Sequence, residues 1–134
     1  MINRILNKEK VMLIVIFSLS VLSACKHEAL ECDPNAIVFE RDIQPILISN
    51  CTMEACHDAV DPEEGIDLTS YEAMMSSDEA IDPGNPSNSD LLESIKETDP
   101  SDRMPKGLPP LTAEQIRKIE LWISLGAKNE KCNF

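Results

Sequence analysis

The segment Asn50-Cys51-Thr52-Met53-Glu54-Ala55-Cys56-His57 places two thiols and an imidazole within seven residues of a 134-residue chain. Four residues separate the cysteines, and the histidine directly follows the second one. The rest of the chain supplies only three Phe, one Tyr and one Trp. Because a small domain with few large apolar side chains usually depends on a disulfide, a metal or a cofactor, the use of these cysteines largely determines the core.

The order of the three side chains favours covalent haem attachment, for which the usual spacing is C-x-x-C-H. In that arrangement the thiols of Cys51 and Cys56 would bond to the haem vinyl groups, and His57 would bind the iron. The two extra residues can bulge outward, since only Cys56 and His57 must be adjacent. Two alternatives remain open, a Cys51 to Cys56 disulfide and a partial zinc site, although zinc prefers four N or S ligands and His27 is the only other histidine.

A second iron ligand is predicted at Met104, which follows His57 by 47 residues. Methionine thioether is a common axial ligand because it favours the reduced iron. Pro105 directly follows Met104 and restricts its backbone. We expect Met74 and Met75 to lie in the core or the pocket wall, and Met53 to lie at the surface or the rim.

The hydrophobic pattern predicts an all-α fold of about four short helices separated by long loops. An amphipathic stripe runs from Phe39 to Leu47, with Pro45 in its first turn or at a kink. Further helices are expected after caps at Thr69 or Ser70, at Asn85-Pro86, and at the Thr112 capping box. Gly126 is expected to end the last helix.

The first 24 residues are interpreted as a signal peptide and not as part of the fold. Basic residues precede an apolar run from Val11 to Leu22, and small residues lead to Cys25. The run is shorter than the roughly 20 residues of a membrane-spanning helix. It resembles a bacterial lipoprotein signal, which implies lipidation of Cys25 and an anchor on a membrane facing the periplasm or the cell exterior. An ordinary cleaved secretory signal is the alternative.

Charge excludes one class of partner. The chain holds 12 basic and 24 acidic residues, and removal of the signal leaves a net charge near -14. Nucleic acid is therefore not an expected partner. A basic redox protein is an expected partner, because opposite charges steer association. The acidic surface also serves solubility.

Six motifs in order carry a resemblance to a known family. They are Phe39-Glu40-Arg41-Asp42-Ile43-Gln44-Pro45-Ile46-Leu47, Cys51 with Cys56-His57, Leu68-Thr69-Ser70-Tyr71-Glu72, Pro83-Gly84-Asn85-Pro86, Arg103-Met104-Pro105 and Trp122-Ile123-Ser124-Leu125-Gly126-Ala127. Together they resemble the planctomycete-type cytochrome c domain family over roughly residues 37–128. Residues 25–36 would then be a tether and residues 129–134 a tail.

The resemblance implies a class I cytochrome c fold around one covalent haem c. Carried over, Cys51 and Cys56 would form the thioether links, His57 would be the proximal ligand and Met104 the distal one. The widened cysteine spacing departs from the family pattern.

Cys32 and Cys132 bracket this domain, and an exported protein can form disulfides. We expect the two to pair.

These observations predict a monohaem electron carrier outside the cytoplasm, not an enzyme. Two alternatives stay open. One is a haem sensor or peroxidase-like protein in which Met104 leaves the iron. The other is a haem-free binding or structural lipoprotein with two disulfides.

Overall fold

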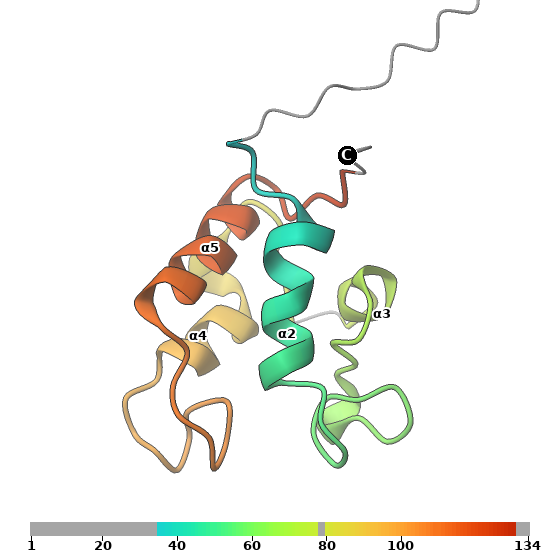
Figure 1. Cartoon of the computed structure of the whole chain (residues 1–134), viewed down its shortest axis with the longest axis vertical. Helices are drawn as coiled ribbons and strands as arrows, with labels where there is room; N and C mark the ends of the chain where they lie inside the picture. Colours follow the sequence, from blue (N-terminus) through green and yellow to red (C-terminus); the bar gives the residue numbers. More distant parts are fainter. Residues whose placement is uncertain (1–34, 78–79, 131–134) are drawn as a thin grey trace, which may run out of the picture. The chain divides into compact units, whose positions relative to one another are not determined.

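A computed structural model describes residues 35–77 and 80–130 (Figure 1). Its elements, in chain order, are the π-helix η2 (Phe39–Ile43), α2 (Gln44–Asn50), the 3-10 helix η3 (Glu63–Gly65), α3 (Tyr71–Met75), the 3-10 helix η4 (Pro86–Asn88), α4 (Asp90–Lys96) and α5 (Ala113–Ser124). The described residues contain no strand. The predicted all-α class, with four short α-helices joined by loops, is confirmed.

The helix before the cysteines begins with a π-turn. The Gln44 N–H donates to the Phe39 carbonyl, five residues back, and Pro45 then lies in the first turn of α2. The ring of Pro45 would clash with the Arg41 carbonyl in a continuous α-helix, and the wider turn precedes this position. The expected stripe is buried, with Phe39, Ile43 and Leu47 at most 1% exposed.

Local capping sets the beginning of two helices and the end of one. The Ser70 hydroxyl accepts a hydrogen bond from the Ala73 N–H at the start of α3. At α5, Thr112 and Gln115 form the predicted capping box. After α5, the Gly126 N–H donates to the Ile123 carbonyl and the Ala127 N–H to the Trp122 carbonyl, which is a Schellman motif. Gly126 has a φ of 97°, a value at which glycine avoids strain.

The predicted start of α4 is wrong by several residues. Asn85-Pro86 opens only the 3-10 turn η4, and α4 begins at Asp90. Ser89, which is 1% exposed, stands between them and accepts a hydrogen bond from the Asp82 N–H at 2.9 Å. The buried hydroxyl holds the turn before the helix, a tertiary contact that a capping pattern does not reveal.

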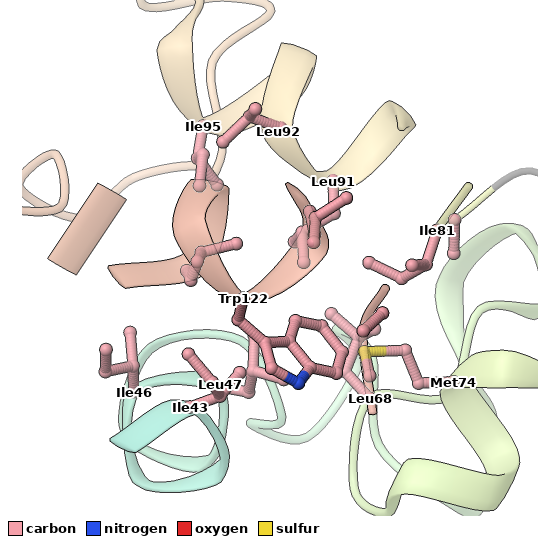
Figure 2. Close-up of a cluster of buried hydrophobic side chains, with 14 of the residues drawn as sticks. Ile43, Ile46, Leu47, Leu68, Met74, Ile81, Leu91, Leu92, Ile95 and Trp122 are labelled. Carbon is pink, nitrogen blue, oxygen red and sulfur yellow. The ribbon is translucent and has the colours of Figure 1, made fainter. Parts of the chain in front are cut away.

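Trp122 lies at the centre of the core, which Figure 2 shows in close-up. Its indole is 1% exposed, and apolar side chains surround it from all four α-helices and from the segment before η4. The labelled members of this core are Ile43, Ile46, Leu47, Leu68, Met74, Ile81, Leu91, Leu92 and Ile95. Met74 is fully buried and Met75 packs against the core, as expected for both.

Three aromatic rings connect η2, α3 and α5. The Phe39 ring centroid lies 5.3 Å from that of Tyr71 and 5.4 Å from that of Trp122. The Tyr71 hydroxyl donates to the Ala127 carbonyl at 2.9 Å, and the Trp122 indole N–H donates to the Lys128 carbonyl at 3.0 Å. The aromatic residues within the described part of the chain are thus concentrated where they tie the C-terminal turn to the core.

Several sequence predictions fall outside the described residues. They are the signal peptide over residues 1–24, lipidation of Cys25, and the pairing of Cys32 with Cys132. These stay predictions. Among the residues that the structure does describe, no helix has the length and apolar character needed to cross a membrane.

Candidate functional site

Residues 50–57, the candidate attachment segment, begin at the end of α2 and loop back to it. The Cys51 N–H donates to the Leu47 carbonyl at 2.8 Å, which continues the helical pattern, and the His57 N–H donates to the Cys51 carbonyl at 3.0 Å. The intervening residues are therefore looped out, with Met53, Glu54 and Ala55 exposed. The extra residues bulge outward, as expected, and the backbone of His57 lies beside that of Cys51.

His57 is held in a defined tautomer. Its Nδ1 lies 3.0 Å from the Ile66 carbonyl oxygen, and its own carbonyl accepts from the Leu68 N–H at 3.1 Å. Because a carbonyl can only accept, Nδ1 carries the proton and Nε2 keeps its lone pair. This is the usual arrangement of a metal-binding histidine, whose second nitrogen is fixed by a backbone acceptor.

The two thiols differ in their surroundings. Cys51 is 6% exposed, whereas Cys56 is half-buried. Burial, with a smaller contribution from nearby Cys56, raises the pKa of the Cys51 thiol to about 11. Both are free cysteines, so the structure does not contain the Cys51 to Cys56 disulfide that the sequence left open.

Met104 reaches the same region from the loop between α4 and α5. Its N–H donates to the Ser94 carbonyl at 3.0 Å, which fixes the loop against α4. The Met104 side chain is half-buried and packs against the core, and Pro105 is buried. In Figure 1 this loop and the loop that follows α2 lie at the same end of the helices.

Two adjacent cavities bring the predicted ligands together. The larger, of about 310 Å³, is lined by Cys51, His57 and Met104. The smaller, of about 160 Å³, is lined by these three and also by Cys56. Apolar side chains complete the wall of the larger cavity, namely Ile66, Leu68, Ala80, Leu91 and Ile95.

These residues fit a covalently attached haem. Two free thiols, an imidazole with an available Nε2 and a thioether line two adjacent cavities, the larger of which has an apolar wall. Pockets for cofactors generally span ~300 to 1,000 Å³ with a few placed polar groups. By contrast, no group of three or more His, Cys, Asp and Glu side chains is placed to hold a metal ion within the described part of the chain.

The comparison with known families agrees with this geometry. Residues 54–107 match the model of the planctomycete cytochrome C family. This segment contains Cys56, His57 and Met104, and the match indicates a c-type cytochrome. The match begins at residue 54 and therefore does not include Cys51, which precedes it in the chain. No curated protein and no solved structure matches the chain.

Sequence reasoning missed the groups that position the ligands. The carbonyls of Ile66 and Ser94 leave no trace in a motif, because every residue carries a carbonyl. Asp58 could have been found, since an aspartate directly after an irregular turn often binds backbone amides. Its carboxylate accepts from the N–H groups of Val60, Asp61 and Ala55 at 2.7, 3.1 and 3.1 Å. The bonds from Val60 and Asp61 are the main reason that the pKa of Asp58 is lowered.

Five carboxylates stand at the edge of the larger cavity, and all are exposed. Asp90 and Glu93 lie on α4 and Glu97 directly follows it, while Glu64 lies in η3 and Asp102 in the loop between α4 and α5. None forms an ion pair with another described residue. We call this set the acidic rim.

Proposed function

We propose that this protein is a monohaem c-type cytochrome that transfers single electrons outside the cytoplasm. The observation that carries the proposal is the convergence of Cys51, Cys56, His57 and Met104 on adjacent cavities within a segment that largely matches the model of a cytochrome c family. When bound, haem supplies an iron that alternates between the ferrous and ferric states. The remaining functions belong to side chains and backbone groups of the chain itself.

Each of the four side chains has a separate role in this proposal. The Cys51 and Cys56 thiols hold the group covalently, and each thiol hydrogen passes to the vinyl carbon that does not bond to sulfur. Nε2 of His57 and the sulfur of Met104 would bind the iron. With both ligands in place, no iron position would be open to a substrate, which supports an electron carrier over an enzyme.

The apolar wall contributes by excluding water. Leu68 and Leu91 are 3% and 8% exposed and line the cavity together with half-buried Ile66. A dry environment and a thioether ligand both favour the reduced iron and raise the reduction potential. The hydrogen bond from His57 Nδ1 to the Ile66 carbonyl fixes the orientation of the imidazole.

The acidic rim suggests the chemistry of the redox partner. We propose a basic docking patch, because unpaired carboxylates around the mouth of the cavity would attract it at long range. Such attraction increases the association rate and weakens as salt screens it, with a Debye length of ~10 Å at 0.1 M. Lipidation of Cys25 would hold the carrier at a bacterial membrane, facing the periplasm or the cell exterior.

The test of the proposal is a pyridine haemochrome spectrum on full-length protein exported from a host with cytochrome c maturation. We expect one haem per chain that survives acid-acetone extraction, and loss of covalent haem when both cysteines are replaced by alanine. A colourless protein would overturn the proposal and favour the haem-free lipoprotein.

The axial ligand is tested with a matched pair of substitutions. Met104→Leu removes the sulfur but keeps apolar volume, and Met75→Leu does the same outside the cavity. We expect only Met104→Leu to abolish the methionine-to-iron absorption band of the ferric protein and to lower the potential. Absence of this band from the unmodified protein would favour a sensor or peroxidase-like protein with a free sixth position.

The rim is tested with small redox reagents of opposite charge. Oxidation by a cationic reagent such as hexaammineruthenium(III) should slow as salt rises, and oxidation by ferricyanide should accelerate. Asp90→Asn with Glu93→Gln should reduce both dependences, whereas Glu72→Gln, at an exposed position of α3, should not. Equal salt dependence for both reagents would contradict a docking role for the rim.

A further inference from the structure

The widened spacing between Cys51 and Cys56 raises a geometric problem. Extra residues between two attachment thiols give the loop additional conformations, and both sulfurs must nevertheless reach one group. Cys51 is fixed by the end of α2, where its N–H donates to the Leu47 carbonyl. Cys56 lies beyond the bulge, and its placement depends on how the loop is closed.

Asp58 closes the loop from its far side. One carboxylate oxygen, Oδ2, accepts from the N–H of Ala55, which is inside the bulge. The other, Oδ1, accepts from the N–H groups of Val60 and Asp61, which follow the attachment segment. A single side chain thereby joins the backbone before Cys56 to the backbone after His57.

The turn that the Asp58 carboxylate holds contains a residue in a strained conformation. Ala55 has a φ of 62°, a left-handed conformation that is uncommon for residues with a Cβ. The Cys56 N–H donates to the Met53 carbonyl at 2.9 Å, and the Cys56 carbonyl accepts from the Glu63 N–H at 2.7 Å. The hydrogen bond to Asp58 offsets part of the cost of the Ala55 conformation.

We propose that Asp58 is a positioning residue that allows this widened segment to present both thiols to one haem. The inference rests on the proposed function, because it concerns how the same site is loaded. In each addition the sulfur bonds to a vinyl carbon, the vinyl π bond is lost, and the thiol hydrogen moves to the neighbouring carbon. No oxidant or reductant is required, so geometry is the main demand on the protein.

The proposal predicts that loss of the Asp58 carboxylate impairs haem attachment at Cys56 but not at Cys51. Loss of the Asp58 carboxylate would release Ala55 and the backbone around Val60, and Cys56 lies between these points. Cys51 would keep its place, because its helical hydrogen bond and its burial do not involve Asp58. The expected defect is therefore a protein attached through Cys51 alone, with an unreacted Cys56 thiol.

The experiment compares Asp58→Ala, Asp58→Asn and the matched control Asp61→Asn in full-length exported protein. Asp61→Asn removes the same charge from the same loop, and no described group donates to its carboxylate. Free thiols are alkylated under denaturing conditions, and peptides cleaved after Glu54 report Cys51 and Cys56 separately by mass spectrometry. The α-band of the pyridine haemochrome gives a second readout, because one remaining vinyl group moves it to longer wavelength.

We expect most Asp58→Ala chains to carry an alkylated Cys56 and the shifted band, with Cys51 still linked. Asp58→Asn should fall between Asp58→Ala and the control, because its amide oxygen can still accept from Val60 and Asp61 while its NH₂ group opposes the Ala55 N–H. If Asp58→Ala protein cannot be recovered, the comparison of Asp58→Asn with Asp61→Asn tests the inference. Complete attachment at both cysteines in either Asp58 variant would overturn this inference, whereas unmodified protein without haem would instead overturn the proposed function.

Discussion

Alkylation of Cys51 in the haem-free, full-length chain should be about a hundredfold slower in the folded state than in denaturant at pH 8. The thiolate is the reactive form, and burial raises the pKa of Cys51 from 9.0 to about 11. At pH 8 the thiolate fraction therefore falls from about one in ten to about one in a thousand. Limited access to a sulfur in a residue that is 6% exposed adds to the effect.

The assay treats reduced protein with iodoacetamide, quenches at intervals and separates the two cysteines by cleavage after Glu54. Half-buried Cys56 is an internal reference and should react faster than Cys51 in the folded chain. In denaturant the two should react at similar rates. Equal rates in the folded chain would refute the reasoning, because they would mean that the Cys51 site is open without haem.

The same burial predicts a pH dependence of stability. The pKa of the thiol is higher in the folded chain than in an exposed cysteine, so folding favours the protonated form. Its stabilisation is complete below about pH 9 and is lost as the pH rises through about 11. The loss should approach about 2 to 3 kcal/mol. Subtracting the unfolding curve of Cys51→Ala, which lacks this group, isolates it from other alkaline transitions.

Three further predictions concern stability and are measured by thermal or urea unfolding. Ile123→Ala should lower the free energy of unfolding by about 2 to 5 kcal/mol, because Ile123 is fully buried. Leu121→Ala, on the exposed face of α5, should change it by no more than about 0.5 kcal/mol. Similar losses for both variants would contradict the assigned faces of α5. Tyr71→Phe, which removes the hydrogen bond to the Ala127 carbonyl but keeps the ring, should cost about 1 kcal/mol and lower the Tm by about 4 to 8 °C. Thr112→Ala should cost about 0.5 to 2 kcal/mol, and an unchanged Tm would show that the capping box contributes nothing.

The sequence by itself determined the features that depend on local order. The stripe from Phe39 to Leu47, the capping box at Thr112 and the turn at Gly126 are each encoded within a few residues, and the structure has all three. The all-α class follows from these patterns. The adjacency of Cys56 and His57 and the spacing to Met104 likewise pointed to these residues, and the structure places them around two adjacent cavities.

Tertiary structure alone decided where α4 begins and what surrounds the candidate ligands. The buried hydroxyl of Ser89 accepts a hydrogen bond from the Asp82 N–H, and α4 begins after it at Asp90 and not at Pro86. The carbonyls of Ile66 and Ser94, which hold His57 and Met104, have no sequence signal of their own. The acidic rim combines α4 with η3 and with the loop between α4 and α5. Such features arise only when the chain folds back on itself, because they are made by backbone groups and by residues whose proximity no local pattern records.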